Sequence, residues 1–338
     1  MKHKISVPGK LFISGEYAVV DGYHAVLLPT KAALHVDIES SNQWSIYSTQ
    51  WDNSVEYTIE DIASNQTESW RKTLHTVYSY LKELNIVIMP HHIHISSDLD
   101  QMKHKLGLGS SGALTIGLIE AVLTFHQVAF TPLESYKLGV LSTRHDINKS
   151  SYADIACSAF KKPILYKKFI QLSTNLNIKR LISENWQGLL IETFDAKLPL
   201  MVIHTNKSAS STALVDTLNQ SIDDATKSFI FKQIDTCSTQ MYQAILEDNH
   251  TQLTTWMTQH ERYLRQLDRY TDEAIYIPEI KDIFQILKTY RVAFKTSGAG
   301  GGDNIIAVIP SVEMYNEMKH QFESYPVINH MIQGVCYE

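Results

Sequence analysis

Cysteine and long apolar runs are both scarce in this chain of 338 residues. The three cysteines, Cys157, Cys237 and Cys336, lie far apart without Cys-x-x-Cys spacing, so we expect free thiols in a reducing cytoplasm. No apolar stretch approaches the length that spans a bilayer, and Pro8-Gly9 interrupts any signal-peptide core. We therefore predict a cytoplasmic protein that does not act at a membrane.

Positive charge is also limited, because 30 Lys and Arg against 36 Asp and Glu give a formal net charge of −6. The chain has no basic run or arm, which argues against a general nucleic-acid role. An anionic substrate would then be held by a few local Lys and Arg side chains. The length predicts two domains with a sizeable core. We place them at residues 1–185 and 186–338.

Glycine is scarce as well, but seven of the 14 glycines lie in two runs, Gly107–Gly112 and Ser297–Asp303. The first run leads into an apolar segment that predicts a buried helix from Ala113 to Leu123. Glycine lets backbone N–H groups approach a ligand closely, and a helix N-terminus attracts phosphate. The pattern predicts a nucleotide-using phosphotransferase.

This first run alone has a simpler interpretation. A Gly-Ser stretch before a helix is more often an ordinary loop in which serine caps the helix. The run lacks the lysine of a Walker A loop and does not fit the GxGxxG dinucleotide pattern. A third segment, Pro8–Val20, strengthens the case for phosphate chemistry.

In this third segment, Ile5–Val7 and Leu11–Ile13 are predicted to be two strand pieces, broken by Pro8-Gly9 and ended by Gly15. Lys10 would then be displayed at a bend, where it can meet an anionic group. A solvated hairpin lysine is the alternative.

Taken in order, the three segments resemble the three signature motifs of the GHMP kinases, from Pro8 to Asp303. The resemblance implies an α+β fold of two domains, one like ribosomal protein S5 and one ferredoxin-like. It also implies ATP and Mg²⁺ as cofactors, with Ser110 and Ser111 approaching the metal. The residues expected around the ATP phosphates are Lys105, Gly107, Leu108, Gly109, Ser110, Ser111 and Gly112.

Within this superfamily the details resemble the phosphomevalonate kinase branch. Asp303 closes the third loop where mevalonate kinases carry glycine, and Tyr17 stands where they tend to have histidine. The segment Thr205–Thr212 resembles a Thr-Gly-x-x-Ala-Ser-Thr segment of the branch. The positions that depart from the branch pattern are Ala153, Asn206 and Asn304.

The resemblance implies ATP-dependent phosphorylation of 5-phosphomevalonate to 5-diphosphomevalonate, in the mevalonate route to isoprenoids, by direct in-line transfer. Mevalonate kinase or another GHMP small-molecule kinase is the alternative. A nucleotide-binding pseudokinase or sensor that kept the fold is a rival from another class. The expected partners are ATP and a small phosphorylated acceptor, and a homodimer is left open.

Two residues are expected to carry the chemistry. Asp154 follows a serine-rich turn and matches the catalytic base of mevalonate-type kinases, although aspartate also suits a helix N-cap. Lys10 would stabilise developing charge on the transferred phosphoryl group. If the acceptor is already a phosphate, it needs no strong base, and Lys10 would matter more than Asp154.

Metal and substrate contacts are less defined. Ser142–Asp146 lacks the glutamate with which mevalonate kinases hold the metal, and Asp146 is either a substitute or a solvated helix end. Arg262 could bind phosphate bidentately or be a surface helix residue. The full set of substrate-binding candidates is Lys207, Ser208, Ser211, Arg262, Ser297, Gly298, Ala299 and Gly300.

The hydrophobic pattern predicts an α+β order of elements. The strands are expected at 33–39, 45–47, 54–59, 92–96, 182–194 and 198–205. The helices are expected at 70–84, 132–145, 212–248, 251–267 and 280–290, before a final βαβ-like segment. His91, His92 and His94 are interpreted as part of a solvated strand rather than a metal site.

Overall fold

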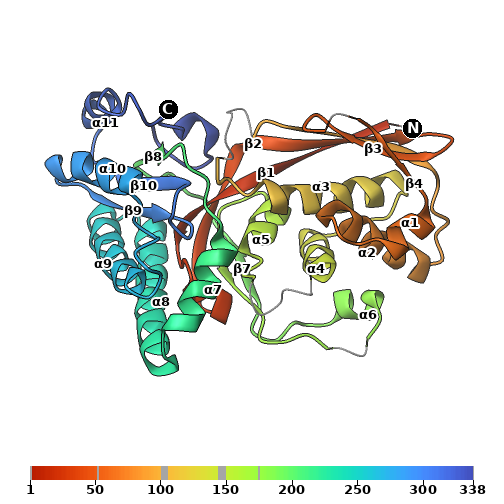
Figure 1. The fold of residues 1–338 in the computed structure, drawn as a ribbon, viewed down its shortest axis with the longest axis horizontal. Coiled ribbons are helices and arrows are strands. Elements are labelled where there is room, and N and C mark those ends of the chain that lie inside the picture. Colours follow the sequence, from red (N-terminus) through yellow and green to blue (C-terminus); the bar gives the residue numbers. More distant parts are fainter. Residues whose placement is uncertain (1, 52, 100–105, 144–149, 174–175, 338) are drawn as a thin grey trace.

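The computed structural model describes residues 2–51, 53–99, 106–143, 150–173 and 176–337. Two lobes lie side by side along the long axis of the molecule (Figure 1). Strands β1 (Lys2–Ser14) and β2 (His24–Ser40) pair antiparallel and extend through the first lobe to its junction with the second. The long hairpin therefore carries the N-terminal segment to the boundary between the lobes.

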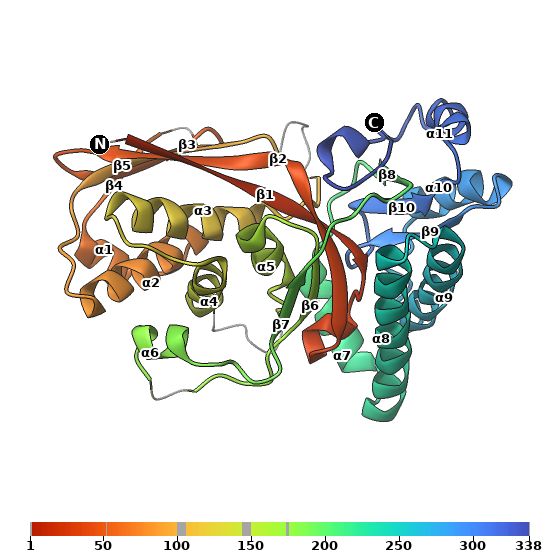
Figure 2. The same ribbon diagram turned by 180° about the vertical axis from the view of Figure 1, so that it is seen from behind.

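The first lobe is built on a mixed sheet with the order β4-β3-β5-β2-β6-β7, while β1 also pairs with β2. Helices cover one face of this sheet, as the view from behind shows (Figure 2). The remaining strands are β3 (Trp44–Ser48), β4 (Val55–Tyr57), β5 (His91–Ser97), β6 (Ile164–Lys167) and β7 (Leu190–Thr193). The helices are η1 (Ala18–Asp21), α1 (Ile59–Ser64), α2 (Ser69–Glu83), α3 (Ser110–Phe125), α4 (Pro132–Ser142), α5 (Ala153–Phe160) and α6 (Ile178–Ser183).

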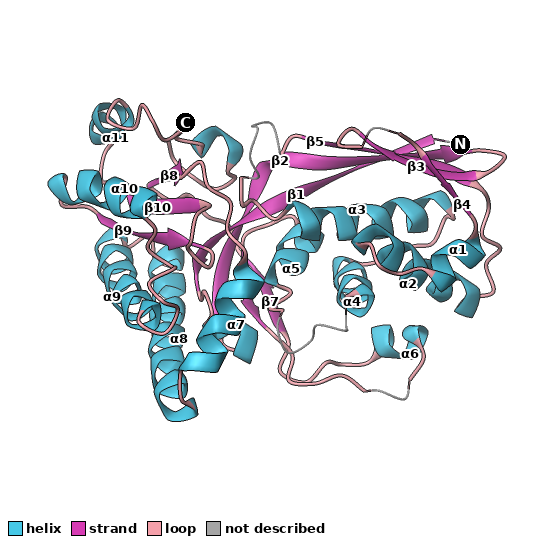
Figure 3. Cartoon of the chain, in the orientation of Figure 1, coloured by secondary structure: helices cyan, strands magenta, loops and turns pink. Residues whose placement is uncertain are grey.

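The second lobe contains an antiparallel sheet in the order β8-β10-β9 together with the C-terminal helices (Figure 3). Its strands are β8 (Leu200–His204), β9 (Ala293–Ser297) and β10 (Asn304–Val308). Its helices are α7 (Ser211–Ser221), α8 (Asp224–Leu246), α9 (His250–Asp268), α10 (Pro278–Thr289), α11 (Val312–Lys319) and η3 (Asn329–Met331).

Two hydrophobic cores correspond to the two lobes, and each contains residues from the other side of the boundary. Tyr17, Ala18 and Val20 follow β1 but belong to the core of the second lobe. Met241 and Tyr242 of α8 belong to the core of the first lobe. Because burial of apolar surface is the main favourable term in folding, these residues hold the lobes together.

Several sequence predictions are confirmed. The helix predicted after the first glycine run is present, although it begins at Ser110 rather than Ala113, and α2, α9 and α10 agree with their predicted ranges within two residues. The helix predicted from residue 132 is α4, which Thr131 caps through a capping box with Glu134 and which has Pro132 in its first turn. The cysteines are free thiols.

Other predictions are corrected. Pro8-Gly9 does not divide the N-terminal strand, because β1 continues through a register shift at this point. The predicted strand 182–194 is mostly wrong: α6 ends at Ser183 and only β7 is extended. The region predicted to be helical over 212–248 is divided into α7 and α8. Helix α4 ends at Ser142 rather than near residue 145. The last elements run β9, β10, α11 rather than βαβ.

The division into residues 1–185 and 186–338 remains our proposal. Strand β7 lies beyond the proposed boundary but pairs with β6 in the first sheet.

Within the described ranges, no helix combines the length and apolar character needed to cross a membrane.

Candidate active site

The first motif and the middle glycine loop meet through backbone contacts. The amide of Lys10 donates to the carbonyl oxygen of Leu108 at 2.7 Å, and its Nζ donates to the carbonyl of Gly107 at 2.9 Å. A Cβ at Gly9 would lie 2.0 Å from the Leu108 oxygen, so only glycine permits this approach. The register shift in β1 therefore brings the lysine to the loop.

The middle loop ends at the N-terminus of α3. Gly109 occupies the N-cap position with φ +80°, and its lack of a side chain leaves the helix without a side-chain cap. The first N–H groups of an α-helix have no partner within the helix, and they carry the positive end of its dipole. Ser111 and Gly112 of this first turn line a cavity. This arrangement suits a phosphate group.

The third glycine loop contacts the segment that follows β1. The hydroxyl of Ser297 donates to the carbonyl of Phe12 at 2.7 Å, and the hydroxyl of Tyr17 donates to the carbonyl of Ala299 at 2.5 Å. Asp303 lies against the middle loop, because a Cβ at Gly107 would lie 2.3 Å from its Cγ. The three motifs thus border one space.

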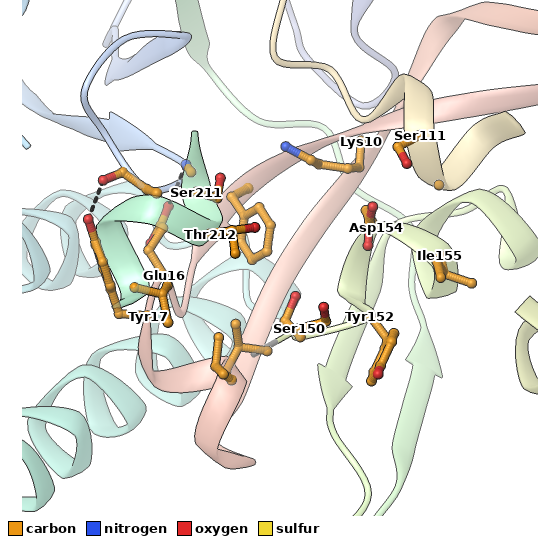
Figure 4. A pocket seen from close by; sticks show the side chains of 18 of the residues that line it. Lys10, Glu16, Tyr17, Ser111, Ser150, Tyr152, Asp154, Ile155, Ser211 and Thr212 are labelled. Carbon is orange, nitrogen blue, oxygen red and sulfur yellow. Dashed lines mark hydrogen bonds between the residues drawn. The ribbon is translucent and has the colours of Figure 1, made fainter. Parts of the chain in front are cut away.

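That space is a cavity of about 300 Å³ between the lobes. Figure 4 shows Lys10, Ser111 and Asp154 on one side of it and Glu16, Tyr17 and Ser211 on the other. Lys10 is the one cationic side chain among the described lining residues. The polar or charged lining residues are Lys10, Glu16, Tyr17, Ser111, Thr115, Thr143, Ser150, Ser151, Tyr152, Asp154, Ser211, Thr212 and Asp303.

Asp154 is fixed by the first turn of α5. Tyr152 precedes this helix in the left-handed conformation, with φ +59°, and its ring stacks on Phe169. The contact with Gly112 is close, since a Cβ there would lie 2.9 Å from Asp154 Oδ2. Burial raises the pKa of the Asp154 carboxyl, and the charge of Lys10 opposes this change. The carboxylate therefore faces both the lysine and the phosphate-binding turn.

Asp303 is a second acidic neighbour of Lys10. Burial raises the pKa of this carboxyl too, and the opposing influences are the Lys10 charge, the N–H of Ala209 and His204. Its Oδ1 accepts from the Ala209 amide at 3.3 Å. The charge of Lys10 thus acts on the Asp154 and Asp303 carboxyls, while its Nζ is held by the Gly107 carbonyl near the N-terminus of α3. A cation at this place can neutralise a transferring phosphoryl group.

Several of the predicted site residues meet at the cavity: Lys10, Ser111, Gly112, Asp154, Ser211, Gly298 and Ala299. Others do not line it. Gly107, Leu108, Gly109 and Ser110 form the loop beside it, and Ser297 and Gly300 brace the third loop.

Three substrate-binding candidates lie away from the cavity lining. Lys207 is exposed and forms an ion pair with Glu279 at 3.4 Å. Ser208 is exposed, and Arg262 points from the exposed side of α9 toward Gln259. Arg262 therefore lies on the surface of a helix, which was the alternative interpretation of this residue. The predictions for Lys105 and Asp146 lie outside the described residues.

Sequence reasoning missed other lining residues, above all Glu16, Tyr17, Thr212 and Ser150-Ser151. Glu16 and Tyr17 were visible as part of the first motif, but only their pairing with the third loop gives them a place at the site. Ser150-Ser151 precedes Asp154 directly, and this proximity was the available signal.

Comparisons with known proteins agree with this geometry. The family models "GHMP kinases N terminal domain" and "GHMP kinases C terminal" match residues 72–162 and 241–324, more than half of the chain. The phosphomevalonate kinase of Streptomyces sp. (strain CL190) is 25% identical, with 89% of this chain and 88% of that protein covered. The mevalonate kinase of Methanocaldococcus jannaschii is also 25% identical, with 90% and 91% covered.

A solved structure gives the fold independently. Streptococcus pneumoniae phosphomevalonate kinase in complex with phosphomevalonate and AMPPNP superposes with a TM-score of 0.85, at 20% identity, over 96% of this chain and 98% of that one. The fold and the site define a two-domain α+β phosphotransferase. The chain belongs to the GHMP kinase family of ATP-using small-molecule kinases.

Proposed function

We propose that this kinase transfers the γ-phosphoryl group of ATP to the phosphate of 5-phosphomevalonate, giving 5-diphosphomevalonate and ADP. An oxygen of the acceptor phosphate attacks the γ-phosphorus in line, and the bond to the β–γ bridging oxygen breaks. The acceptor is already anionic at neutral pH, so the step needs no proton to be removed by a strong base. An ATP-dependent reaction and three free cysteines suit a reducing cytoplasm.

The observation that carries this proposal is the contact between two features typical of the phosphomevalonate kinase branch. The Asp303 amide donates to the carbonyl of Lys207 at 2.8 Å, and the Asp303 carbonyl accepts from the Thr205 amide at 2.9 Å. With the Ala209 contact, these bonds fasten the segment Thr205–Thr212 to the third loop. These bonds support 5-phosphomevalonate as the acceptor, because the segment that they fasten carries Ser211 and Thr212, which line the cavity.

The proposed roles follow from position. Lys10 neutralises charge on the transferring group, and Asp154 orients Lys10 and the acceptor. The N-terminus of α3, with Ser110 and Ser111, holds the ATP phosphates. Ser211, Gly298 and Ala299 contact the acceptor on the opposite side. Lys207, Ser208 and Arg262 would contribute only if the second lobe moved, because they do not line the cavity.

Mg²⁺ fits the donors present on the nucleotide side. The Ser111 hydroxyl and the Asp154 carboxylate both line the cavity, on either side of Gly112. No group of three or more His, Cys, Asp or Glu in the described part of the chain could hold a metal by itself. Mg²⁺ commonly binds through one or two protein oxygens and the substrate phosphates, where it neutralises charge.

A hydroxyl acceptor such as mevalonate is the second candidate, favoured by the position of Asp154 as a base. The deciding experiment measures ADP release with ATP, Mg²⁺ and, separately, mevalonate, 5-phosphomevalonate and 5-diphosphomevalonate. Turnover only with 5-phosphomevalonate is the expected result. Turnover with mevalonate instead would overturn the proposed acceptor, and no turnover with any of the three would overturn the assignment to this pathway.

A further inference from the structure

A buried ion pair joins the two lobes beside the cavity. Lys295 of β9 and Glu16, which follows β1, approach to 2.5 Å between Nζ and Oε1. Their exposed fractions are 0% and 2%. Desolvation offsets much of the Coulomb attraction in such a pair, so net stability is a weak explanation for its presence. Its neighbours indicate a more specific role.

Glu16 holds one wall of the cavity. Its Oε1 also accepts the amide of Gly298 at 3.3 Å, and the neighbouring Tyr17 hydroxyl donates to the carbonyl of Ala299. Gly298 has φ +92°, and among the described residues no atom beyond its two chain neighbours lies within 4 Å of where its Cβ would be. Side-chain packing therefore does not fix this part of the third loop, which depends on the hydrogen bonds from the first motif.

His260 of α9 completes the surroundings of Glu16 without adding charge. Its Nε2 accepts the amide of Gly15 at 3.1 Å, so this nitrogen carries no proton and cannot donate to Glu16 Oε2, 3.4 Å away. Burial, and then the charge of Lys295, lowers the pKa of His260. The adjacent Glu261 pairs with Arg265 instead. Lys295 is therefore the cation that balances Glu16.

We propose that Lys295 is a positioning residue that acts through Glu16 to hold Gly298 and Ala299 as the acceptor-side wall of the cavity. Loss of the charge pair releases Glu16 from its fixed rotamer, and the Gly298 amide loses its acceptor. The wall then moves away from the acceptor, while the ATP-binding turn of α3 stays in place. The inference rests on the proposed function, which identifies the acceptor.

The test replaces both charges at once, because removing one would leave the other buried without a partner. In Glu16→Gln/Lys295→Met, the KM for 5-phosphomevalonate should rise about tenfold, with the KM for ATP within about twofold. Amide hydrogen exchange of residues 297–303 should accelerate about tenfold. The matched control is Glu120→Gln/Lys161→Met. It removes an ion pair whose Nζ and Oε2 atoms are 2.7 Å apart and whose residues do not line the cavity. It should lower the melting temperature and leave both readouts unchanged.

The inference would be overturned if a folded double variant had the same KM for the acceptor as the wild type, or the same rate of amide exchange at residues 297–303. If the double variant does not fold, Glu16→Gln alone provides the test, because the amide keeps the size of the side chain and removes its charge, while Lys295 keeps its hydrogen bond to the Thr296 carbonyl. Exchange at 297–303 must then rise at least about threefold, or the inference fails. The exchange measurement needs no acceptor, so it separates failure of this inference from failure of the proposed function.

Discussion

The amide of Lys10 donates a 2.7 Å hydrogen bond to the carbonyl of Leu108, which joins the first motif to the phosphate-binding loop. The Lys10 side chain turns back to the same loop and reaches the Gly107 carbonyl. The position of the ammonium group is therefore set by the loop that we expect to hold the ATP phosphates. A change in either segment should affect binding and transfer together.

Replacing Lys10 with methionine should lower kcat by about 10² to 10³, because a preorganised charge at the transferring group is lost. Because the Lys10 side chain is only half-buried, the melting temperature should change by only a few degrees. Steady-state ADP release and circular dichroism measure the two effects. Lys4→Met, at an exposed position of β1, is the control and should keep full activity. A kcat within about threefold of wild type would refute the assigned role of Lys10.

Gly109→Ala should weaken ATP binding at least about tenfold, measured by calorimetry with a non-hydrolysable ATP analogue. The new Cβ would lie 2.8 Å from the Cγ of Lys10, and the backbone has φ +80°. Gly22→Ala separates these two causes, since Gly22 has φ +84° but its nearest neighbour would be 3.7 Å away. Both variants carry a backbone strain of about 1 kcal/mol. Equal ATP affinities in the two variants would contradict a phosphate-binding role for this loop.

Asn304→Ala should raise the KM for ATP. The side-chain amide of Asn304, in β10, donates to the Leu106 carbonyl at 2.8 Å. It therefore fixes the residue that directly precedes the phosphate-binding loop. Losing a buried hydrogen bond also costs about 1–3 kcal/mol of unfolding free energy. Asn329→Ala is the matched control, because Asn329 is equally buried and donates to the Leu200 carbonyl at 2.6 Å. Both variants should lose stability, and only Asn304→Ala should lose affinity for ATP.

The local parts of the site could be predicted from the sequence. A glycine run before an apolar segment predicts α3 to within three residues of its start, and the hydrophobic pattern predicts the start of α4 at Pro132. The three motifs meet as their resemblance to the GHMP kinases implied. The two helix starts depend on residues close together in the chain, whereas the meeting of the motifs does not and was implied by the resemblance alone.

The remaining parts depend on contacts between distant residues. Pro8-Gly9 looked like a strand break, but pairing with the long β2 carries β1 across it as a register shift. The interaction of Glu16 with Lys295 crosses almost the whole chain, so neither residue showed its role beforehand. Arg262 had the chemistry for phosphate binding, but the side of α9 on which it lies is decided by packing of the second core.

His91 shows the same limit, because the strand expected to be solvated buries this ring completely. Its ring nitrogens are 2.9 Å from the Tyr78 hydroxyl and 2.8 Å from the Met89 carbonyl oxygen. Burial lowers the pKa of His91 to about 4, from 6.5 for an exposed histidine. Between these pH values the unfolded chain binds more protons at this site than the folded chain. Stability due to His91 is therefore present above pH 6.5 and falls as the pH drops toward 4.

Over this range His91 should contribute a loss of about 3 kcal/mol in the free energy of unfolding, at about 1.4 kcal/mol per pH unit. Glu261 gives the opposite slope, because burial raises the pKa of its carboxyl to about 8. The useful quantity is therefore the difference between urea unfolding curves of wild type and His91→Gln from pH 7 to 4.5. The variant should be less stable at pH 7 and should lose less stability on acidification. Parallel curves for wild type and His91→Gln would show that this ring does not titrate as inferred.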